Sequence, residues 1–321
     1  MSAADGFAAM AVRAKTHASY GSLWRTFSRW CDDHAVSTLK ALAEEDLCAA
    51  AVWFCRTHKF SSLKNYVSAI RHVQLGAGLG ELERGVRWQR VKQGLSNFYS
   101  LTQEVEKKLA LSVDQLRAIS KIVDQTDEFQ SVCWFATVIA WHALLRVGEY
   151  CDGRMRWRDV KLCDRGVAVN VRFDKVKLKP REVCVVAWPS EQALCIVHAF
   201  NQFVKARGGA YGTSDAPLLS CGGVVLSKQK YIAQLKQWAA VACSVQKSVV
   251  AGHSLRRGGT TALTQAGVPE MLIQHHGRWE SFTNREYVHF VGALAWEPSA
   301  RLREALSPAG AQVVSPLTAK R

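Results

Sequence analysis

Four short segments hold residues whose types and spacing could do chemistry. The first, WHALLRVGEY at residues 141–150, places Arg146 and Glu149 three residues apart at the end of an apolar helix. Charged side chains with this spacing can meet on one helix face. Because Arg146 follows a run of apolar residues, we expect its side chain to point into the domain, where a guanidinium needs an anion. Glu149 and a bound phosphate could share that role, and an ordinary surface ion pair is the alternative.

The second segment, GHSLRRGGTTALTQAG at residues 252–267, places His253 and Arg256 three residues apart near a helix start. Both are expected to project from one face toward the same point, and a helix N-terminus itself favours an anion. Arg257 is expected to point elsewhere and to contact solvent or backbone. The pattern H-x-x-R occurs by chance in many proteins, so it needs the other segments beside it.

The third segment, HHGRWESFTNREYVHF at residues 275–290, offers Trp279 and Tyr287. A tyrosine on an amphipathic helix normally packs and leaves its hydroxyl in water. The adjacent His275 and His276 would need a third ligand to hold a metal.

The fourth segment is the connection DKVKLKPR between two expected strands, which carries Lys175, Lys177 and Lys179. A solvated hairpin tip is the ordinary interpretation of such a loop. One of these lysines could instead reach into the groove of a bound DNA.

Composition favours a polyanionic partner. The 321 residues include 42 Lys and Arg against 27 Asp and Glu, a net charge of +15, and basic residues that meet phosphates release condensed counterions. The segment between Arg56 and Lys92 is the most basic part of the N-terminal region. Its candidate phosphate contacts are Arg56, Lys59, Lys64 and Arg71.

Several other classes of protein are excluded by pattern. No apolar run reaches the ~20 residues of a membrane span, and the first residues lack the pattern of a signal peptide, so we expect the protein to stay inside the cell. The ten cysteines include no C-x-x-C pair and are expected to be reduced and mostly buried. No metal-binding spacing or Walker-type nucleotide motif occurs, and no cofactor is expected.

Residues 1 to about 105 are predicted to be wholly helical. Aromatic and aliphatic residues recur there at steps of three and four, which places them on helix faces that form a core. The first such helix carries Tyr20, Leu23, Trp24, Phe27 and Trp30. A second runs through residues 52–55, and a third through residues 63–75 with Ser61 and Ser62 as candidate caps. Residues 96–111 are predicted to link two domains.

Residues 106–306 are predicted to combine helices with a small antiparallel sheet. Ser112 should cap a helix to Val123, and an apolar helix should run from about Glu128 to Leu145. Alternating apolar residues then predict strands at 167–173 and 183–187. Further helices are expected at 190–207, at 227–245 and from 253 onward, and residues 307–321 are expected to be disordered. The fold class is therefore mainly α with a small antiparallel β-sheet.

In chain order the segments give Arg, Lys, His-x-x-Arg, Trp and Tyr. This order resembles the tyrosine recombinases, the phage-integrase-like superfamily, over nearly the whole chain. ALLRVGE resembles the first-arginine motif of that family, and HSLRRGGTTALTQAGVPEMLIQHHGRW resembles its H-x-x-R block. The G-R-W form is similar to that of eukaryotic mobile-element members such as cryptons. The resemblance implies a helical, SAM-like core-binding domain at 1–105 that contacts DNA and an α+β catalytic domain at 106–306.

The resemblance also implies a reaction without metal, ATP or other cofactor. Tyr287 would attack the scissile phosphate and form a 3′-phosphotyrosyl link, while Arg146 and Arg256 would clamp the non-bridging oxygens. His253 would move the tyrosine proton or hydrogen-bond the phosphate, and Glu149 would hold the basic residues in place. Lys175, or alternatively Lys177, would protonate the leaving oxygen.

The position that many members fill with His or Trp is ambiguous here. Trp279 precedes Tyr287 by eight residues and Arg278 by nine, which is the spacing of many members. The role of a neutral hydrogen-bond donor favours Trp279. His276 stands where an aliphatic residue is usual.

Recombination of two duplexes takes four cuts, so the resemblance implies a homo-tetramer assembled on double-stranded DNA. Residues 293–306 would dock on a neighbouring subunit or pack as an ordinary terminal helix. A type IB topoisomerase-like relaxing enzyme and a catalytically silent DNA-binding protein from a mobile element are the alternative functions. We expect the protein to lie with DNA, in the nucleus of a eukaryotic host or otherwise in the nucleoid.

Overall fold

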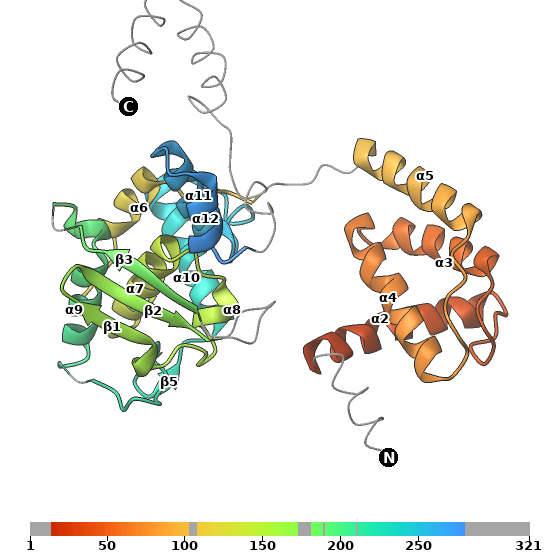
Figure 1. Ribbon diagram of the computed structural model, residues 1–321, viewed down its shortest axis with the longest axis horizontal. Helices are drawn as coiled ribbons and strands as arrows, with labels where there is room; N and C mark the ends of the chain where they lie inside the picture. Colours follow the sequence, from red (N-terminus) through yellow and green to blue (C-terminus); the bar gives the residue numbers. More distant parts are fainter. Residues whose placement is uncertain (1–13, 103–107, 173–180, 189, 210, 280–321) are drawn as a thin grey trace, which may run out of the picture. The chain divides into compact units, whose positions relative to one another are not determined.

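The computed structural model describes residues 14–102, 108–172, 181–188, 190–209 and 211–279 (Figure 1). The chain divides into two compact units, Met1–Val105 and Glu106–Arg321. Each unit has its own hydrophobic core, and each is described separately below.

The described part of the first unit contains helices and no strands, as predicted. Its elements are α2 (Ala14–Asp33), α3 (Glu44–Thr57), a 3₁₀ turn (Phe60–Ser62), α4 (Leu63–Gly76) and α5 (Val86–Thr102). The aromatic positions of the expected first helix supply the core, since Phe27 and Trp30 are buried and Trp24 packs against them. The ring of Phe54 stacks on that of Tyr66 with centroids 4.1 Å apart.

Two details of the first unit correct the sequence predictions. Ser62 precedes α4, but its side chain makes no capping hydrogen bond, because the preceding 3₁₀ turn already places it in a helical conformation. Residues 96–102 belong to helix α5 and not to a linker. Leu95 and Tyr99 pack against the core of this unit, and this packing stabilises the helix over residues that were predicted to be linker.

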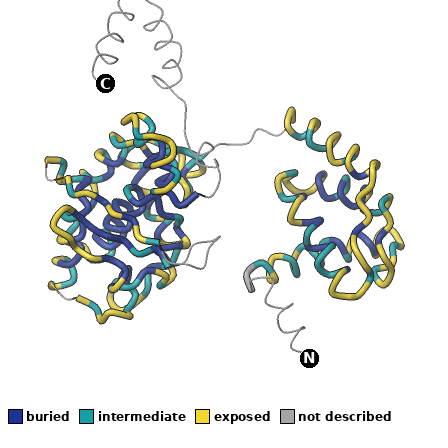
Figure 2. Tube along the Cα trace, in the orientation of Figure 1, coloured by how far each residue is buried: buried dark blue, intermediate teal, exposed yellow. Residues whose placement is uncertain are grey.

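The second unit is built around one buried helix. Its helices are α6 (Val113–Ser120), α7 (Glu128–His142), α8 (Val147–Tyr150), α9 (Ile196–Ala206), α10 (Lys228–Cys243), α11 (Ser254–Gln265) and α12 (Glu270–His276), with 3₁₀ turns at Trp157–Asp159 and Gln192–Leu194. All residues of α7 from Ser131 to Trp141 are buried, and the helix lies in the dark blue centre of the unit (Figure 2). Helices α9, α10 and α11 all pack against it.

Helices α6 and α7 begin where predicted and end earlier, whereas α9 begins at Ile196, six residues after the predicted start at 190. Ser112 accepts a hydrogen bond from the Gln115 amide and forms a capping box before α6, as expected from the sequence. The helix ends at Ser120, three residues before the predicted end. Similarly, α7 ends at His142 and not at Leu145, because Leu144 takes a left-handed conformation with φ 48° that breaks the helix.

The predicted antiparallel sheet is present with one strand more than expected. Strands β1 (Val160–Cys163), β2 (Gly166–Val171) and β3 (Arg181–Val186) form it in the order β1-β2-β3. Val169 pairs with Val183 and Val167 with Val185, so the two alternating runs that predicted strands face each other. Strand β1 gave no alternating signal because only its first residue is buried. A second antiparallel pair, β4 (Ser220–Cys221) and β5 (Val224–Val225), has two residues in each strand.

The thiols also follow the prediction. All ten cysteines are free, and six of them are buried. In the part of the chain that the structure describes, no helix is long and apolar enough to span a membrane.

Candidate active site

The site begins at the C-terminal end of α7, where the chain turns into α8. After the left-handed Leu144, Arg146 is the residue that precedes α8 and Glu149 lies in its first turn. The backbone N–H of Arg146 donates to Glu149 Oε2 at 2.8 Å, and Arg146 Nη1 donates to Glu149 Oε1 at 2.8 Å. The pairing of these two residues agrees with the sequence prediction. Its geometry does not, since the pair closes the start of a new short helix and does not end the apolar helix.

A second arginine reaches the same place from α11. Arg256 is fully buried, and its two terminal nitrogens donate to backbone carbonyls, Nη1 to Leu144 O and Nη2 to Gly277 O. Two glycines that follow it allow this approach. A Cβ at Gly258 would lie 1.8 Å from Leu111 O, and one at Gly259 would lie 2.3 Å from Trp141 O. Gly258 and Gly259 therefore let α11 lie against Leu111, which precedes α6, and against the end of α7.

The third part of the site is the turn that ends α12. The amide of Arg278 donates to His275 O and that of Trp279 to Gln274 O, both at 3.0 Å, which is the Schellman pattern. Arg278 occupies the left-handed position of this motif with φ 60°, where glycine is usual. A left-handed conformation costs a residue with a side chain about 1–2 kcal/mol, so other contacts of Arg278 must offset that cost.

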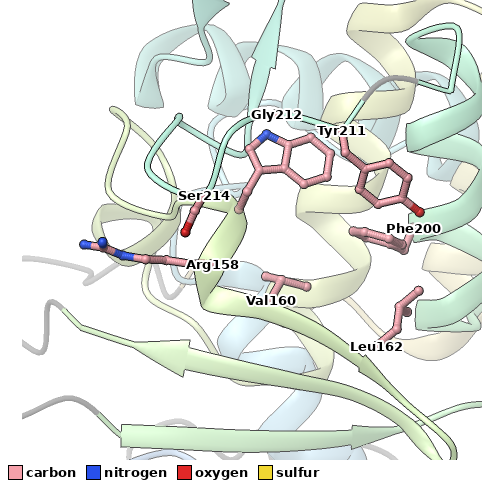
Figure 3. Close-up of a pocket in the computed structure, with 8 residues that line it drawn as sticks. Arg158, Val160, Leu162, Phe200, Tyr211, Gly212 and Ser214 are labelled. Carbon is pink, nitrogen blue, oxygen red and sulfur yellow. The ribbon is translucent and has the colours of Figure 1, made fainter.

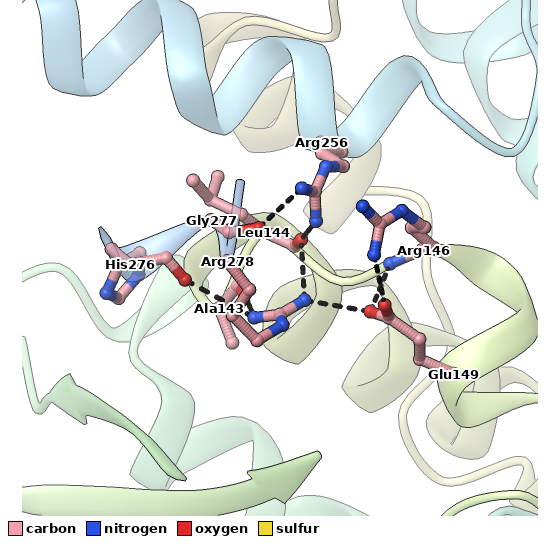
Figure 4. Close-up of polar contacts among 8 residues, drawn as sticks. All are labelled: Ala143, Leu144, Arg146, Glu149, Arg256, His276, Gly277 and Arg278. Atoms are coloured by element: carbon pink, nitrogen blue, oxygen red, sulfur yellow. Dashed lines mark hydrogen bonds and ion pairs between the residues drawn. The ribbon is translucent and has the colours of Figure 1, made fainter. Parts of the chain in front are cut away.

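Those contacts come from its guanidinium, which is almost completely buried. Nη2 donates to Glu149 Oε2 at 2.8 Å and to Leu144 O at 3.2 Å, while Nη1 donates to Ala143 O at 3.0 Å. Arg278 thus binds the second oxygen of the carboxylate that also pairs with Arg146. Figure 4 shows the three arginines arranged around Glu149 and the Leu144 carbonyl.

Trp279 completes the turn by folding back over Arg256. The guanidinium carbon of Arg256 lies 4.0 Å from the centroid of the indole ring, close enough for a cation–π interaction. The Gly277 position has to be a glycine for this to happen, because a Cβ there would lie 1.6 Å from the ring. Of the two candidates for the ambiguous His/Trp role, Arg278 is thus bonded to Glu149, and Trp279 is stacked on an arginine.

One physical cause explains why so many donors gather here. The last carbonyls of a helix have no partners within it and carry the negative end of the helix dipole. His142 O, at the end of α7, accepts from His276 Nε2 of α12 at 2.7 Å. The carbonyls of Ala143 and Leu144, just past that end, accept from Arg278, and Leu144 O also accepts from Arg256. The bond to His142 O gives His276 a structural role. Burial lowers the pKa of His276, with the charge of Arg278 acting in the same direction.

His142 extends the same network toward α9. Its Nε2 donates to Leu194 O at 2.9 Å, and burial lowers its pKa from 6.5 to about 4. His142 and His276 are therefore neutral at physiological pH and act as hydrogen-bond donors, not as extra charges.

The site as a whole is a cationic cluster that opens at one residue. Arg146, Arg256, Arg278 and Glu149 carry a net charge of +2 between them. The side chain of Arg146 is 18% exposed, against 1% for Arg278 and 3% for Glu149. A fixed, partly exposed guanidinium with further positive charge behind it is suited to an anion such as a phosphodiester.

The remaining predicted site residues are distributed as follows. His253 is exposed and directly precedes α11, and Arg257 is half-buried. Lys175, Lys177, Lys179 and Tyr287 lie outside the described residues, as does the 293–306 segment. In the first unit Arg56, Lys59 and Lys64 are exposed, whereas Arg71 is held by both oxygens of Glu81.

A metal site and a pocket are the other features that could carry chemistry. Within the described ranges, no group of three His, Cys, Asp or Glu residues could hold a metal ion. An open pocket of about 340 Å³ in the second unit is lined by Trp157, Arg158, Val160, Leu162, Phe200, Tyr211, Gly212 and Ser214 (Figure 3). Its walls are mainly aromatic and aliphatic, and none of the four cluster residues lines it.

Comparisons with known proteins identify the family and the fold. Residues 110–290 match the Phage integrase family, and no curated protein matches the sequence. The fold is similar to that of the Tn1549 transposon integrase in complex with transposon right end DNA, with a TM-score of 0.66 and 16% identity over 91% of this chain and 94% of that chain.

Two further structures have the same fold. XerH recombinase bound to a palindromic difH substrate gives a TM-score of 0.59 at 16% identity, over 81% of this chain and 72% of that chain. A lambda integrase dimer bound to a COC′ core site gives 0.58 at 16% identity, over 90% and 94%. The predicted fold class, mainly helical with small antiparallel sheets, is confirmed.

Proposed function

The chain belongs to the phage integrase family, the tyrosine recombinases, and we propose that it cleaves and rejoins DNA through a 3′-phosphotyrosyl intermediate, without metal or ATP. The observation that carries this proposal is the Arg146–Glu149–Arg278 arrangement. It fixes one partly exposed guanidinium by a carboxylate whose second oxygen is bound by another arginine. A phosphodiester brought to Arg146 would meet a preorganised donor, which is the main way proteins stabilise charge in phosphoryl transfer.

The proposed step exchanges one phosphoester for another. The Tyr287 oxygen attacks phosphorus, the Tyr–O–P bond forms, and the bond to the 5′ oxygen breaks. The tyrosine proton passes to His253, and the leaving 5′ oxygen takes a proton from Lys175 or Lys177. Because the phosphotyrosine keeps the energy of the broken ester, a 5′ hydroxyl can reverse the step, and no nucleotide is consumed.

The arginines act on the charge that develops during this exchange. Arg146 and Arg256 would hold the non-bridging oxygens, and Trp279 would donate its indole N–H to the phosphate, in addition to keeping Arg256 in place by stacking. In the described structure Arg256 is fully buried and donates to the Leu144 and Gly277 carbonyls, so we propose that its contact with the phosphate forms only when DNA binds and the turn after α12 moves. Losing one such phosphate contact lowers the rate by about 10²–10³-fold in comparable sites.

Exposed basic residues of both units would contact the DNA backbone. We propose Arg56, Lys59, Lys64, Lys177, Lys179 and Arg257 for this role. Arg71 is the weakest candidate, because Glu81 already neutralises it. Four such chains would assemble on two duplexes, with residues 293–306 docking between neighbours. The crypton-like subtype stays a prediction that rests on the G-R-W sequence.

Covalent trapping tests the proposed function. The full chain is mixed with labelled nicked duplexes that carry the termini of its own element, with EDTA present throughout, and adducts that survive SDS are counted. The variants are Tyr287→Phe and, as a matched control, Tyr211→Phe, which removes the hydroxyl of an exposed tyrosine in the pocket of Figure 3.

We expect an adduct with wild type and Tyr211→Phe and none with Tyr287→Phe. DNA that is bound and retarded without any adduct would contradict the proposal and favour a catalytically silent binder. Adducts and relaxation of supercoiled DNA by a species that stays monomeric would favour a type IB topoisomerase-like enzyme instead.

A further inference from the structure

Arg278 occupies a backbone position whose conformation is unfavourable for any residue with a side chain. The turn after α12 follows the Schellman pattern, and Arg278 lies at its left-handed residue with φ 60°. Glycine would satisfy this backbone without strain. An arginine at this position is therefore explained only by what its side chain binds.

The side chain binds elements that are distant in sequence. Its donors reach the carbonyls of Ala143 and Leu144 at the end of α7 and the carboxylate of Glu149 in α8. With 1% of its side chain exposed, Arg278 lies on the inner side of Glu149, whereas Arg146 lies on the side that reaches solvent. This placement separates the two arginines by task, because only Arg146 is accessible from outside.

The shared carboxylate couples the two arginines electrostatically. Glu149 Oε1 accepts from Arg146, and Oε2 accepts from both the Arg146 amide and Arg278. Because Arg278 neutralises much of the charge of Glu149, the carboxylate can fix the direction of Arg146 without cancelling its positive charge. A planar, two-pronged guanidinium meets this geometry, and a lysine ammonium does not.

We propose that Arg278 is a positioning residue, which holds Arg146 toward the scissile phosphate through Glu149 and does not itself contact DNA. This inference rests on the proposed function and refines it, since it resolves which of Arg278 and Trp279 is left to face the phosphate. The same Arg278 contacts also fix the turn that places Trp279 over Arg256.

The test uses Arg278→Gly, which removes the side chain and places at this position the residue type that adopts the left-handed conformation without strain. Ser244→Gly is the matched control, because Ser244 is an exposed residue in the same left-handed conformation at the end of α10. DNA affinity and the rate of covalent adduct formation at saturating DNA are measured separately. Guanidinium chloride, below concentrations that unfold the protein, is added to restore the missing group, with sodium chloride at equal ionic strength as its control.

We expect Arg278→Gly to bind DNA as wild type does and to form the adduct about 10²-fold more slowly, since small displacements of a catalytic group have effects of this size. Guanidinium should recover part of the rate, sodium chloride should not, and Arg278→Lys should stay slow. Ser244→Gly should match wild type in both measurements.

Three results would overturn the proposal for Arg278 alone while the wild type forms its adduct. They are an unchanged rate in Arg278→Gly, a loss of DNA affinity that accounts for the slower rate, and a slow rate that guanidinium does not improve. A wild-type chain that binds DNA and forms no adduct would instead contradict the proposed function, and the role of Arg278 with it.

Discussion

The two units each contain an arginine held by a glutamate, and the two pairs differ in almost everything except their chemistry. In the first unit Arg71 binds both oxygens of Glu81, and the side chains are 43% and 56% exposed. In the second unit Arg278 binds one oxygen of Glu149, and the side chains are 1% and 3% exposed. The pair with the better two-pronged geometry is the one that water screens.

This difference shows how burial changes what an ion pair can do. An exposed pair exchanges contacts with water for contacts with each other, so it contributes little to stability. A buried pair has lost its water, and each remaining donor and acceptor needs a defined partner. The carbonyls of Ala143 and Leu144, just past the end of α7, supply those partners. The buried pair therefore fixes the position of the Arg278 side chain, whereas the exposed pair does not need a fixed geometry.

Removing the two carboxylates should give the largest contrast. We expect Glu149→Ala to lower the free energy of unfolding of the second unit by about 3–5 kcal/mol, because it leaves buried guanidiniums without their anion. Glu81→Ala, the matched exposed variant, should leave the first unit close to wild type. Denaturant unfolding monitored by circular dichroism compares them. Equal losses in the two variants would show that burial does not set the value of these pairs.

Acidification should lower the free energy of unfolding of the second unit through His142, a residue that the sequence analysis did not propose for the site. His142 has a pKa of about 4 when folded, against about 6.5 in an unfolded chain. Between these values the unfolded state binds a proton that the folded state does not, so stability falls as the pH drops from about 6.5 toward 4. The loss is about 1.4 kcal/mol per pH unit for such a group, up to about 3 kcal/mol in total.

His142→Gln keeps a donor for the Leu194 carbonyl and cannot take up that proton. We expect denaturant unfolding at several pH values to show a clearly shallower pH dependence for this variant than for wild type. The lowered pKa of His276 acts in the same direction and leaves a residual slope. A variant whose slope matches wild type would mean that other groups control the acid response.

A smaller change at the turn should disturb the cluster with only a moderate effect on the fold. In Gly277→Ala the added methyl group would lie within 1.6 Å of the Trp279 ring, so the ring must leave Arg256. Overpacking of this kind costs about 1–3 kcal/mol. Gly148→Ala is the control, because nothing lies within 4 Å of its added Cβ. Unfolding and adduct formation should both be impaired in the first variant only, and an unimpaired Gly277→Ala would show that the stack is dispensable.

Apolar periodicity predicted the parts of the fold that pack by apolar area. The spacing of Phe27 and Trp30 identified a core helix, and the alternation of Val167 and Val169 identified a strand, because burial depends on which face a residue occupies. The short strand β1 escaped because three of its four residues are exposed. The end of α7 was misplaced because the left-handed conformation of Leu144 has no signature in the sequence.

The sequence grouped Arg146, Glu149, Arg256 and Trp279 as candidates, and the structure brings these four side chains into one network, whereas Lys175 and Tyr287 lie outside the described residues. The spacing of Arg146 and Glu149 indicated their pairing, whereas the role of Arg278 depends on a chain reversal that brings α12 to the end of α7. The local sequence pointed one residue too early, because glycine is usual at the left-handed position of a Schellman turn, whereas Gly277 has φ −78° and Arg278 takes that position. The contacts to Ala143 and Leu144 join residues more than 130 positions apart, and a single sequence does not encode such a contact locally.

The central claim is that Arg146, held in place by Glu149, meets the negative charge of the scissile phosphate. The scissile position is first mapped from the wild-type adduct. The most direct measurement then compares wild type with Arg146→Ala on two otherwise identical substrates. One substrate has the normal scissile phosphate, and the other has an uncharged methylphosphonate at that position. On the phosphate, the variant should form the adduct about 10²–10³-fold more slowly. On the methylphosphonate, where no charge remains to be matched, most of that difference should disappear. An equal loss on both substrates, or no loss on the phosphate, would contradict the claim.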